Sequence, residues 1–252
     1  MKTVQGIRIK TANEVDILRK AGKILSSIVA QLQSSLTSGM STRDIDQKAE
    51  ELIRRHHVVS AFKGYRGFPG FTCISVNEGV VHGIPGPRII KGGDIVSLDM
   101  GIIYEGYYSD TAVTIPVGNV SPETRRLLDV TSDSLLRGIE QARPGNKLSD
   151  ISFAVQSFVE MHGFSVVRDF VGHGIGKQLH EEPEIPNYGR PGEGPLLREG
   201  MVFAIEPMVN MGTHRTRILN DGWTVVTEDG KPSAHFEHTV AITSNGPEIL
   251  TK

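Results

Sequence analysis

The sequence predicts an α/β fold of the α+β kind, in which helices cover a largely antiparallel sheet. Three observations predict it: long amphipathic stretches, strands joined by tight turns, and a pattern that returns about 106 residues later. A chain of 252 residues, 38% of them hydrophobic, can bury a large core. We therefore expect a single domain over residues 1–252, with internal halves at roughly 12–118 and 119–250.

Two helices open the predicted fold. Residues 12–34 place apolar side chains at helical spacing, and Thr11 or Asn13 could cap the first turn. After a turn around Gly39, a second helix begins near Thr42. A third amphipathic stretch, residues 122–142, lies where a copy of the first helix would be expected.

The repeat is clearest around the second helix. Adding 106 to Gly39 gives Gly145, and adding 106 to Asp44 gives Asp150. The apolar helix face that follows maps onto a second apolar face: Ile45, Ala49, Leu52 and Ile53 onto Ile151, Val155, Phe158 and Val159. We interpret this as an internal duplication, with two helix-helix-sheet halves sharing one core.

Strand signals are strong between and after the helices. Residues 95–103 and 107–115 flank a short turn at 104–106, which is typical of a hairpin. Further strands are predicted at 72–76, 201–206, 223–226 and 236–242. Strands joined by tight turns indicate an antiparallel sheet.

Composition excludes several classes of protein. The 27 basic and 29 acidic residues nearly cancel, so no overall charge favours nucleic acid. The single cysteine, Cys73, rules out a disulfide within the chain and suits a reducing compartment. No apolar segment is long enough to span a membrane, and no signal peptide is evident. The expectation is a cytoplasmic protein without a membrane or nucleic-acid partner.

Four carboxylates interrupt strands that are otherwise apolar: Asp99, Asp110, Glu206 and Glu237. An unpaired buried carboxylate costs several kcal/mol, so four such residues need compensation. The alternative for each of them is a strand-end or bulge residue that faces water.

The predicted hairpin brings two of these carboxylates together. With the turn centred on Glu105 and Gly106, Asp99 lies opposite Ala112, and Asp110 lies two residues along the same strand. Alternation then places both aspartates on one face as diagonal neighbours, roughly 7–8 Å apart at the backbone. Two carboxylates this close repel each other unless a cation lies between them, and a divalent metal is the natural partner.

One imidazole completes a candidate ligand set. His173 lies in a run of glycines at 172–176, which we expect to let the backbone approach a ligand closely. Four carboxylates balance two divalent cations. A site of oxygen ligands with one nitrogen suits manganese, iron or cobalt and tolerates zinc, while the lack of a thiolate ligand excludes a structural zinc site.

Two further histidines, His82 and His180, stand out because each lies at a predicted turn. A capping or surface role is the alternative for both. Cys73 has no obvious base beside it in the sequence, so it is expected to pack as a small hydrophobe and not to act as a nucleophile.

The ordered set of carboxylates and His173 resembles the dimetal site of the methionine aminopeptidase, prolidase and creatinase group. Five surrounding motifs resemble those of type I methionine aminopeptidases in particular: residues 81–85 (VHGIP), 172–176 (GHGIG), 180–183 (HEEP), 203–208 (FAIEPM) and 236–239 (FEHT). The resemblance runs from about residue 5 to the C-terminus and implies the pita-bread fold, two pseudo-symmetric halves around a curved antiparallel sheet with helices on its outer face.

The resemblance also implies site residues. The metal ligands would be Asp99, Asp110, His173, Glu206 and Glu237. Substrate would contact His82 and His180, and the methionine pocket would be lined by Tyr65, Phe68, Cys73, Leu179 and Trp223. A Na or K ion would bind at Asn77, Gly79 and Ser233. The sequence departs from common family patterns at Phe62, Leu179 and His235, which bears on fine specificity.

The implied function is removal of the initiator methionine from nascent proteins, preferably before a small second residue, by a monomeric enzyme working near the ribosome. Two divalent ions (Co, Mn, Fe(II) or Zn) would serve as cofactors, with Asp110 and Glu237 bridging them. Glu206 would shuttle the proton, and His180, alone or with His82, would stabilise the oxyanion. The alternatives are an Xaa-Pro dipeptidase of the same fold and a binding protein that has lost its metals.

Overall fold

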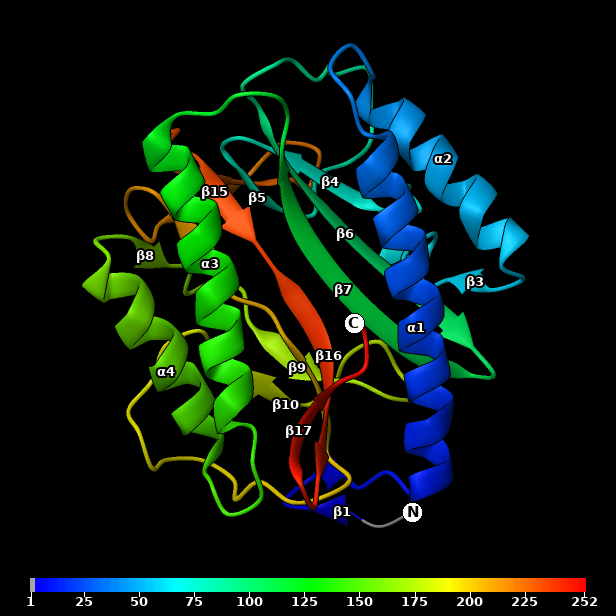
Figure 1. Cartoon of the computed structure of the whole chain (residues 1–252), viewed down its shortest axis with the longest axis vertical. Coiled ribbons are helices and arrows are strands. Elements are labelled where there is room, and N and C mark those ends of the chain that lie inside the picture. The colour runs from blue at the N-terminus through cyan, green and yellow to red at the C-terminus, as the bar shows by residue number, and fades with distance from the viewer. Residues whose placement is uncertain (1–2) are drawn as a thin grey trace.

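The computed structural model describes residues 3–252, in which four long helices lie against one large sheet (Figure 1). In the view of Figure 1, helices α1 and α2 lie to the right of the central strands, and α3 and α4 lie to the left. The helices span Ala12–Ser35 (α1), Thr42–Arg55 (α2), Pro122–Gln141 (α3) and Leu148–Met161 (α4), and a short 3-10 helix spans Tyr65–Gly67. Among residues 3–252, none of these helices has the length and apolar character needed to cross a membrane.

Every paired strand in the described part of the chain runs antiparallel to its neighbour. The main sheet has the order β10-β9-β11-β16-β7-β6-β3, with β17 added to β16 and β4 added to β6. Its strands are β3 (Val59–Ser60), β4 (Cys73–Val76), β6 (Ile95–Tyr104), β7 (Tyr107–Pro116), β9 (Gly172–Gly174), β10 (Glu181–Ile185), β11 (Val202–Ile205), β16 (Glu237–Thr243) and β17 (Gly246–Ile249).

Smaller sheets complete the fold. The pair β1-β2 precedes the first helix, and two three-stranded sheets have the orders β15-β12-β8 and β13-β14-β5. Their strands are β1 (Thr3–Val4), β2 (Ile7–Arg8), β5 (Gly79–Val81), β8 (Ser165–Val166), β12 (Met208–Asn210), β13 (Thr216–Ile218), β14 (Val225–Thr227) and β15 (Ser233–His235).

Helix α1 begins where its capping chemistry places it. Thr11 accepts a hydrogen bond from the backbone N–H of Glu14 at 3.3 Å, and the Glu14 carboxylate accepts the backbone N–H of Thr11 at 2.8 Å. This reciprocal capping box satisfies two N–H groups that the first turn of a helix leaves free. Of the two predicted caps, Thr11 is confirmed.

The backbone carries the predicted repeat. Helices α1 and α2 turn at Gly39, and α3 and α4 turn at Gly145, both with φ of +96°. The carboxylates of Asp44 and Asp150 each accept, at 2.7 Å, the backbone N–H of the residue three positions earlier. Each second helix is also anchored by an isolated β-bridge at its start, Ser41 with Ile89 and Lys147 with Leu196. Two pseudo-symmetric halves therefore build the fold, as the sequence predicts.

Strands β6 and β7 separate a helical face from a polar one. Leu98 and Met100 pack into the apolar core beneath α1 and α2. Because side chains alternate along a strand, Asp99 between them points to the opposite face. The two halves of the main sheet join where β16 pairs with β7, and one of the two pairs there is Glu237 with Ala112. The seam between the halves thus carries acidic residues on the face away from the helices.

Candidate metal centre and substrate pocket

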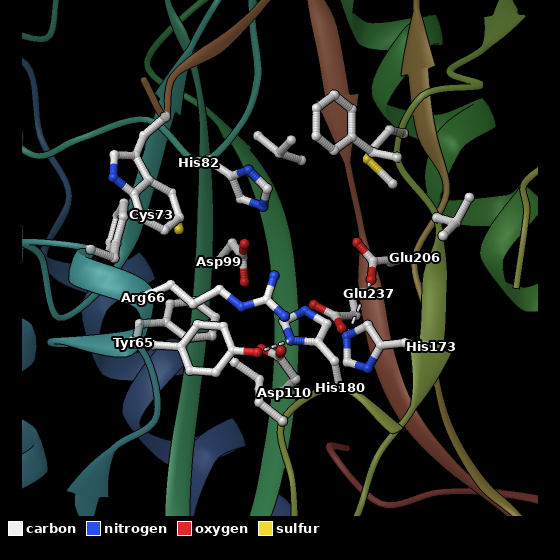
Figure 2. Close-up of a pocket in the computed structure, with 18 of the residues that line it drawn as sticks. Tyr65, Arg66, Cys73, His82, Asp99, Asp110, His173, His180, Glu206 and Glu237 are labelled. Atoms are coloured by element: carbon white, nitrogen blue, oxygen red, sulfur yellow. Dashed lines mark hydrogen bonds and ion pairs between the residues drawn. The ribbon is translucent and has the colours of Figure 1, made fainter. Parts of the chain in front are cut away.

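Five side chains that are distant in the sequence converge on one pocket (Figure 2). Each comes from a strand of the main sheet or its immediate end: Asp99 from β6, Asp110 from β7, His173 from β9, Glu206 directly after β11, and Glu237 from the start of β16. The first two belong to the first half of the molecule and the other three to the second. The structure therefore brings together the whole ligand set that the sequence predicts.

The hairpin register is the one expected from the sequence. Asp99 pairs with Ala112, and Asp110 pairs with Gly101 two residues further along β6, so both carboxylates occupy the same face as diagonal neighbours. A Cβ atom at Gly101 would lie 2.8 Å from the Phe62 ring and 3.3 Å from Asp110 Oδ1. Glycine at 101 therefore leaves room for the Asp110 carboxylate.

The glycines around His173 lie in close contact with the backbones of neighbouring strands. A Cβ at Gly172 would lie 2.5 Å from the Ala204 carbonyl oxygen, and a Cβ at Gly174 would lie 2.1 Å from that of Glu182. These atoms belong to the neighbouring strands β11 and β10. These glycines allow neighbouring backbones to pack against β9, and the expected close approach to a ligand stays a prediction.

The carboxylates fit a cation. Atoms of Asp110, His173 and Glu237 lie within 4.8 Å of one another. Glu206 Oε1 lies 3.5 Å from His173 Nε2, and Asp99 joins the group through the hairpin register. Three buried oxygens, Asp99 Oδ1, Asp110 Oδ1 and Glu237 Oε1, accept no hydrogen bond from any described residue. Buried acceptors without donors are costly, and a cation among them removes that cost.

Electrostatics support this reading. Burial raises the pKa of Asp110 to about 7. Burial, together with the charge of Asp110, raises the pKa of Asp99 and of Glu237 well above their ordinary values. Burial and the charge of Asp99 do the same for Glu206. Burial lowers the pKa of His173 to about 3, so its imidazole is neutral at physiological pH, as a metal ligand must be.

The pocket that holds the acidic cluster has a volume of about 270 Å³, and apolar and aromatic side chains line most of the rest of its wall. All five predicted pocket residues line it: Tyr65, Phe68, Cys73, Leu179 and Trp223. The Phe68 and Trp223 rings meet edge to face with centroids 5.2 Å apart. Cys73 is buried opposite Asp99 in the register of β4 with β6. Burial and the neighbouring Asp99 raise the pKa of its thiol, which favours an inert packing residue over a nucleophile.

Both predicted histidines line the same cavity. The Nδ1 atom of His180 lies 2.8 Å from the Tyr65 hydroxyl, and its ring centroid is 4.3 Å from that of His173. His82 packs edge to face against Phe170 and has φ of +58°. Because a non-glycine residue in this region of backbone space is strained, its surroundings must hold it there. The arrangement favours a site role over the capping or surface alternative.

Sequence reasoning missed several residues of the cavity wall: Arg66, Val81, Asp169, Phe170, Val171 and Met208. Arg66, Asp169, Phe170 and Val171 lie outside the strands, in local conformations that periodicity does not encode, whereas Val81 and Met208 lie in the short strands β5 and β12, which long-range pairing defines. His235 was noted only as a departure from a family pattern. Its Nε2 lies 3.3 Å from Glu206 Oε2 in a fully buried environment. Its spacing of two residues from Glu237 was the signal that could have placed it beside the site.

The three residues expected to hold a monovalent ion, Asn77, Gly79 and Ser233, lie near one another. The backbone N–H of Ser233 donates to the Asn77 carbonyl oxygen at 2.9 Å. Gly79 opens strand β5, which contacts the strand β15 that begins with Ser233.

Comparison with known proteins shows which family and which relatives this chain matches. The model of the family described as Metallopeptidase family M24 matches residues 16–244. A methionine aminopeptidase of Clostridium perfringens is 56% identical over 245 residues, covering 97% of this chain and 98% of the relative. Methionine aminopeptidase 1 of Bacillus subtilis is 52% identical over 243 residues, covering 96% and 98%.

Solved structures agree with these relatives. A crystal structure of methionine aminopeptidase from Thermotoga maritima superposes with a TM-score of 0.96 at 48% identity, covering 98% of this chain and 99% of that one. A prolidase from Pyrococcus furiosus matches less well, with a TM-score of 0.79 at 28% identity. This chain spans only 65% of that prolidase.

Proposed function

The chain belongs to metallopeptidase family M24 and, within it, to the type I methionine aminopeptidases, and from that premise we propose how its residues remove an N-terminal methionine. It is a hydrolase of nascent protein N-termini. The observation that carries this function is one pocket that combines two features. Its apolar walls can surround a methionine side chain, and beside them lie buried carboxylates whose oxygens accept no hydrogen bond.

We propose two divalent ions at this cluster, held by Asp99, Asp110, His173, Glu206 and Glu237. Four carboxylates balance the charge of two such ions, and Asp110, His173 and Glu237 would form the centre of the ligand set because one ligand atom of each lies within 4.8 Å of the others. When bound, such ions supply Lewis-acid polarisation of the scissile carbonyl and make water acidic enough to attack near neutral pH. Cobalt, manganese, iron(II) and zinc all fit oxygen ligands with one imidazole.

The remaining steps belong to the chain's own residues. We propose that Glu206 carries the proton between the attacking water and the leaving amine, because its carboxylate lines the pocket with Oε1 3.5 Å from His173 Nε2. His180, together with His82, would donate to the oxyanion that develops at the carbonyl. Tyr65 holds His180 in place through its hydroxyl.

Substrate selection follows from the shape of the pocket. We propose that Phe68, Leu179 and Trp223 surround the methionine side chain, since apolar and aromatic walls suit a thioether. A small second residue would be preferred. We further propose that the enzyme acts as a cytoplasmic monomer near the ribosome, and that Asn77, Gly79 and Ser233 bind a Na or K ion through backbone oxygens.

The test is hydrolysis of Met-Ala-Ser compared with Xaa-Pro peptides, with metals added one at a time to metal-free protein. We expect release of methionine and no cleavage of Xaa-Pro peptides. Preferential cleavage of Xaa-Pro would favour the dipeptidase alternative. Absence of cleavage with every metal, together with absence of metal binding, would favour the non-catalytic binding protein.

A further inference from the structure

The loop between β9 and β10 carries two pocket residues, Leu179 and His180, and it closes on the first residue of β10. The side chain of that residue, Glu181, turns back beneath the loop. Its Oε1 atom accepts the backbone N–H of Lys177 at 2.8 Å and that of Gln178 at 3.3 Å. The carboxylate therefore fixes the backbone immediately before the two pocket residues.

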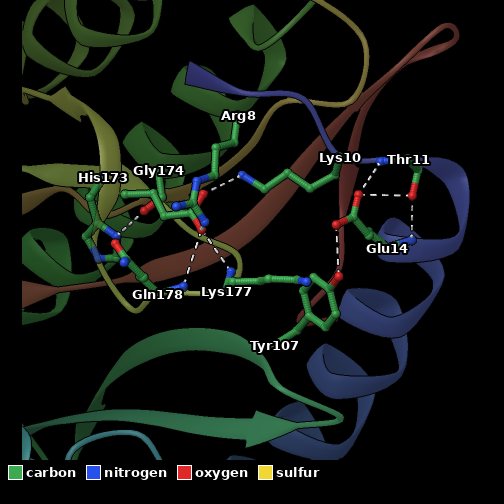
Figure 3. Close-up of polar contacts among 10 residues, drawn as sticks. Arg8, Lys10, Thr11, Glu14, Tyr107, His173, Gly174, Lys177 and Gln178 are labelled. Atoms are coloured by element: carbon green, nitrogen blue, oxygen red, sulfur yellow. Dashed lines mark hydrogen bonds and ion pairs between the residues drawn. The ribbon is translucent and has the colours of Figure 1, made fainter. Parts of the chain in front are cut away.

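The N-terminal segment reaches the same carboxylate (Figure 3). Lys10 Nζ donates to Glu181 Oε2 at 3.0 Å, and Arg8 donates to Oε1 at 3.3 Å. The side chains of Lys10 and Glu181 are only 4% and 3% exposed. The Lys10 backbone is itself held, because its N–H donates to the Gly200 carbonyl at 2.8 Å. Two cations from one end of the chain thus clamp the base of a loop more than 160 residues away.

The loop has little freedom to move around this ion pair. A Cβ at Gly176 would lie 2.8 Å both from Glu181 Oε1 and from Lys10 Cε, so the pair fills the space beneath it. The backbone N–H of Tyr108 donates to the Gly176 carbonyl at 2.8 Å, which joins the loop to the strand that carries Asp110.

We propose that Glu181, clamped by Lys10 and Arg8, is a positioning residue that sets His180 against the metal ligands and Leu179 against the methionine side chain. The proposal rests on the aminopeptidase function above. His180 follows the clamped backbone by two residues and meets the hydroxyl of Tyr65 at 2.8 Å. A small shift of the loop would break that contact and move His180 away from His173.

Stability alone is a weak reason for this ion pair. Burying two charges costs several kcal/mol of desolvation per ion, and apolar residues of similar size often stabilise a fold as well or better. A carboxylate that accepts four N–H groups from two segments instead holds those segments in a defined relative position, because its acceptor positions are directional. The alternative is an ion pair that only ties the N-terminal segment to the sheet.

The experiment compares four variants of the metal-loaded full chain on Met-Ala-Ser: Glu181→Gln, His180→Ala, both together, and Lys10→Met with Glu181→Gln. We expect Glu181→Gln to lower kcat by about 100-fold, the usual cost of a misplacement of about 1 Å, with KM changed less and metal content unchanged. Adding Glu181→Gln to His180→Ala should slow the reaction no further, because both changes remove the same contribution.

The variant that carries both Lys10→Met and Glu181→Gln leaves no unpaired buried charge between these two residues, so it tests the idea even if Glu181→Gln alone fails to fold. It should show the same loss of kcat. The matched control is Glu248→Gln, which breaks the Arg19–Glu248 pair between α1 and β17 away from the pocket. This control should keep wild-type kcat even if its melting temperature falls.

A wild-type kcat in the folded Glu181 variants would overturn the proposal, and so would a full further loss when Glu181→Gln is added to His180→Ala. In either case the ion pair serves stability only. Failure of the aminopeptidase function itself would look different, because the wild-type protein would then release no methionine from Met-Ala-Ser.

Discussion

At the scale of single residues, the site contains two kinds of group: carboxylates that would bind metal ions, and a histidine that would act on charge developing in the substrate. Asp110 and Glu237 have buried oxygens without donors, so in their ionised form they need a cation beside them. His180 is exposed at the pocket and contacts the Tyr65 hydroxyl. Its contribution is expected only when negative charge develops on the substrate.

This division predicts two classes of variant. Asp110→Ala and Glu237→Ala should lose metal and activity together, since each removes a carboxylate from the centre of the proposed ligand set. His180→Ala should keep its metal and lose about 10²–10³ in kcat, the usual cost of one oxyanion donor. Metal content and steady-state kinetics on Met-Ala-Ser distinguish the classes. Loss of metal from His180→Ala would make His180 a ligand, and unchanged kcat would leave it a surface residue.

The same carboxylates predict how the stability of the metal-free protein depends on pH. Their raised pKa values mean that the folded state holds protons that the unfolded state releases near pH 4. The stability this provides is complete below pH 4 and is lost as pH rises through the folded pKa, which is about 7 for Asp110. The buried His173, with a pKa lowered to about 3, acts in the opposite direction only below its unfolded value of 6.5.

Between about pH 7 and 8.5 the carboxylates therefore dominate the pH dependence of the free energy of unfolding. The metal-free protein should become less stable as pH rises over this range. The slope is at most about 1.4 kcal/mol per pH unit for each carboxyl that ionises. Thermal melts across this range, with and without a chelator, measure it. Asp99→Asn should flatten the slope, because the pKa of Asp99 is raised well above its ordinary value. A metal-free protein whose melting temperature rises over this range would refute the clustering.

At the scale of elements, the sequence predicts most of the regular structure because the signals are local. The first helix extends one residue beyond its predicted range, and Thr11 caps it through side-chain chemistry visible in the sequence. The hairpin register follows from a turn at Glu105 and Gly106, whose φ values of +48° and +77° match a tight turn. The diagonal placement of Asp99 and Asp110 was therefore predictable.

Short strands were less predictable, since long-range contacts define them. Strand β9 has three residues, and its glycines are explained only by the backbones of Ala204 and Glu182 beside it. Arg66, with φ of +49°, reaches the cavity through an unusual loop that no periodicity indicates. For the same reason the ion pair between Lys10 and Glu181 could not be predicted from the sequence.

Helix α1 offers a test of packing at the element scale. A Cβ at Gly22 would lie 2.2 Å from the Leu250 carbonyl oxygen, so Gly22→Ala must push the helix off the C-terminal segment. Overpacking costs about 1–3 kcal/mol, which exceeds the gain of about 1 kcal/mol from the better helix propensity of alanine. Gly138→Ala in α3 is the comparison, because its Cβ would lie 2.8 Å from a methyl group of Val155 and not against backbone, so a smaller loss of stability is expected. Equal melting temperatures for the two variants would contradict this account.

At the scale of the whole molecule, the ligand set spans both halves, so metal binding should stabilise the complete fold. An ion present at about 100 times its dissociation constant adds about 2.7 kcal/mol to the free energy of unfolding. A chelator should abolish activity and lower the melting temperature, and cobalt, manganese or iron(II) should restore both. A chelated protein with unchanged activity and melting temperature would exclude the metal centre.

The distribution of ligands along the chain also has a consequence for biosynthesis. Asp99 and Asp110 are synthesised early, but the cluster is incomplete until Glu237 has been added and has paired with β7. A copy of the enzyme that is terminated early keeps two acidic side chains and gains no catalytic centre. The proposed metal centre can therefore form only once nearly the whole chain has been synthesised, and a chain that ends before Glu237 lacks part of the proposed ligand set.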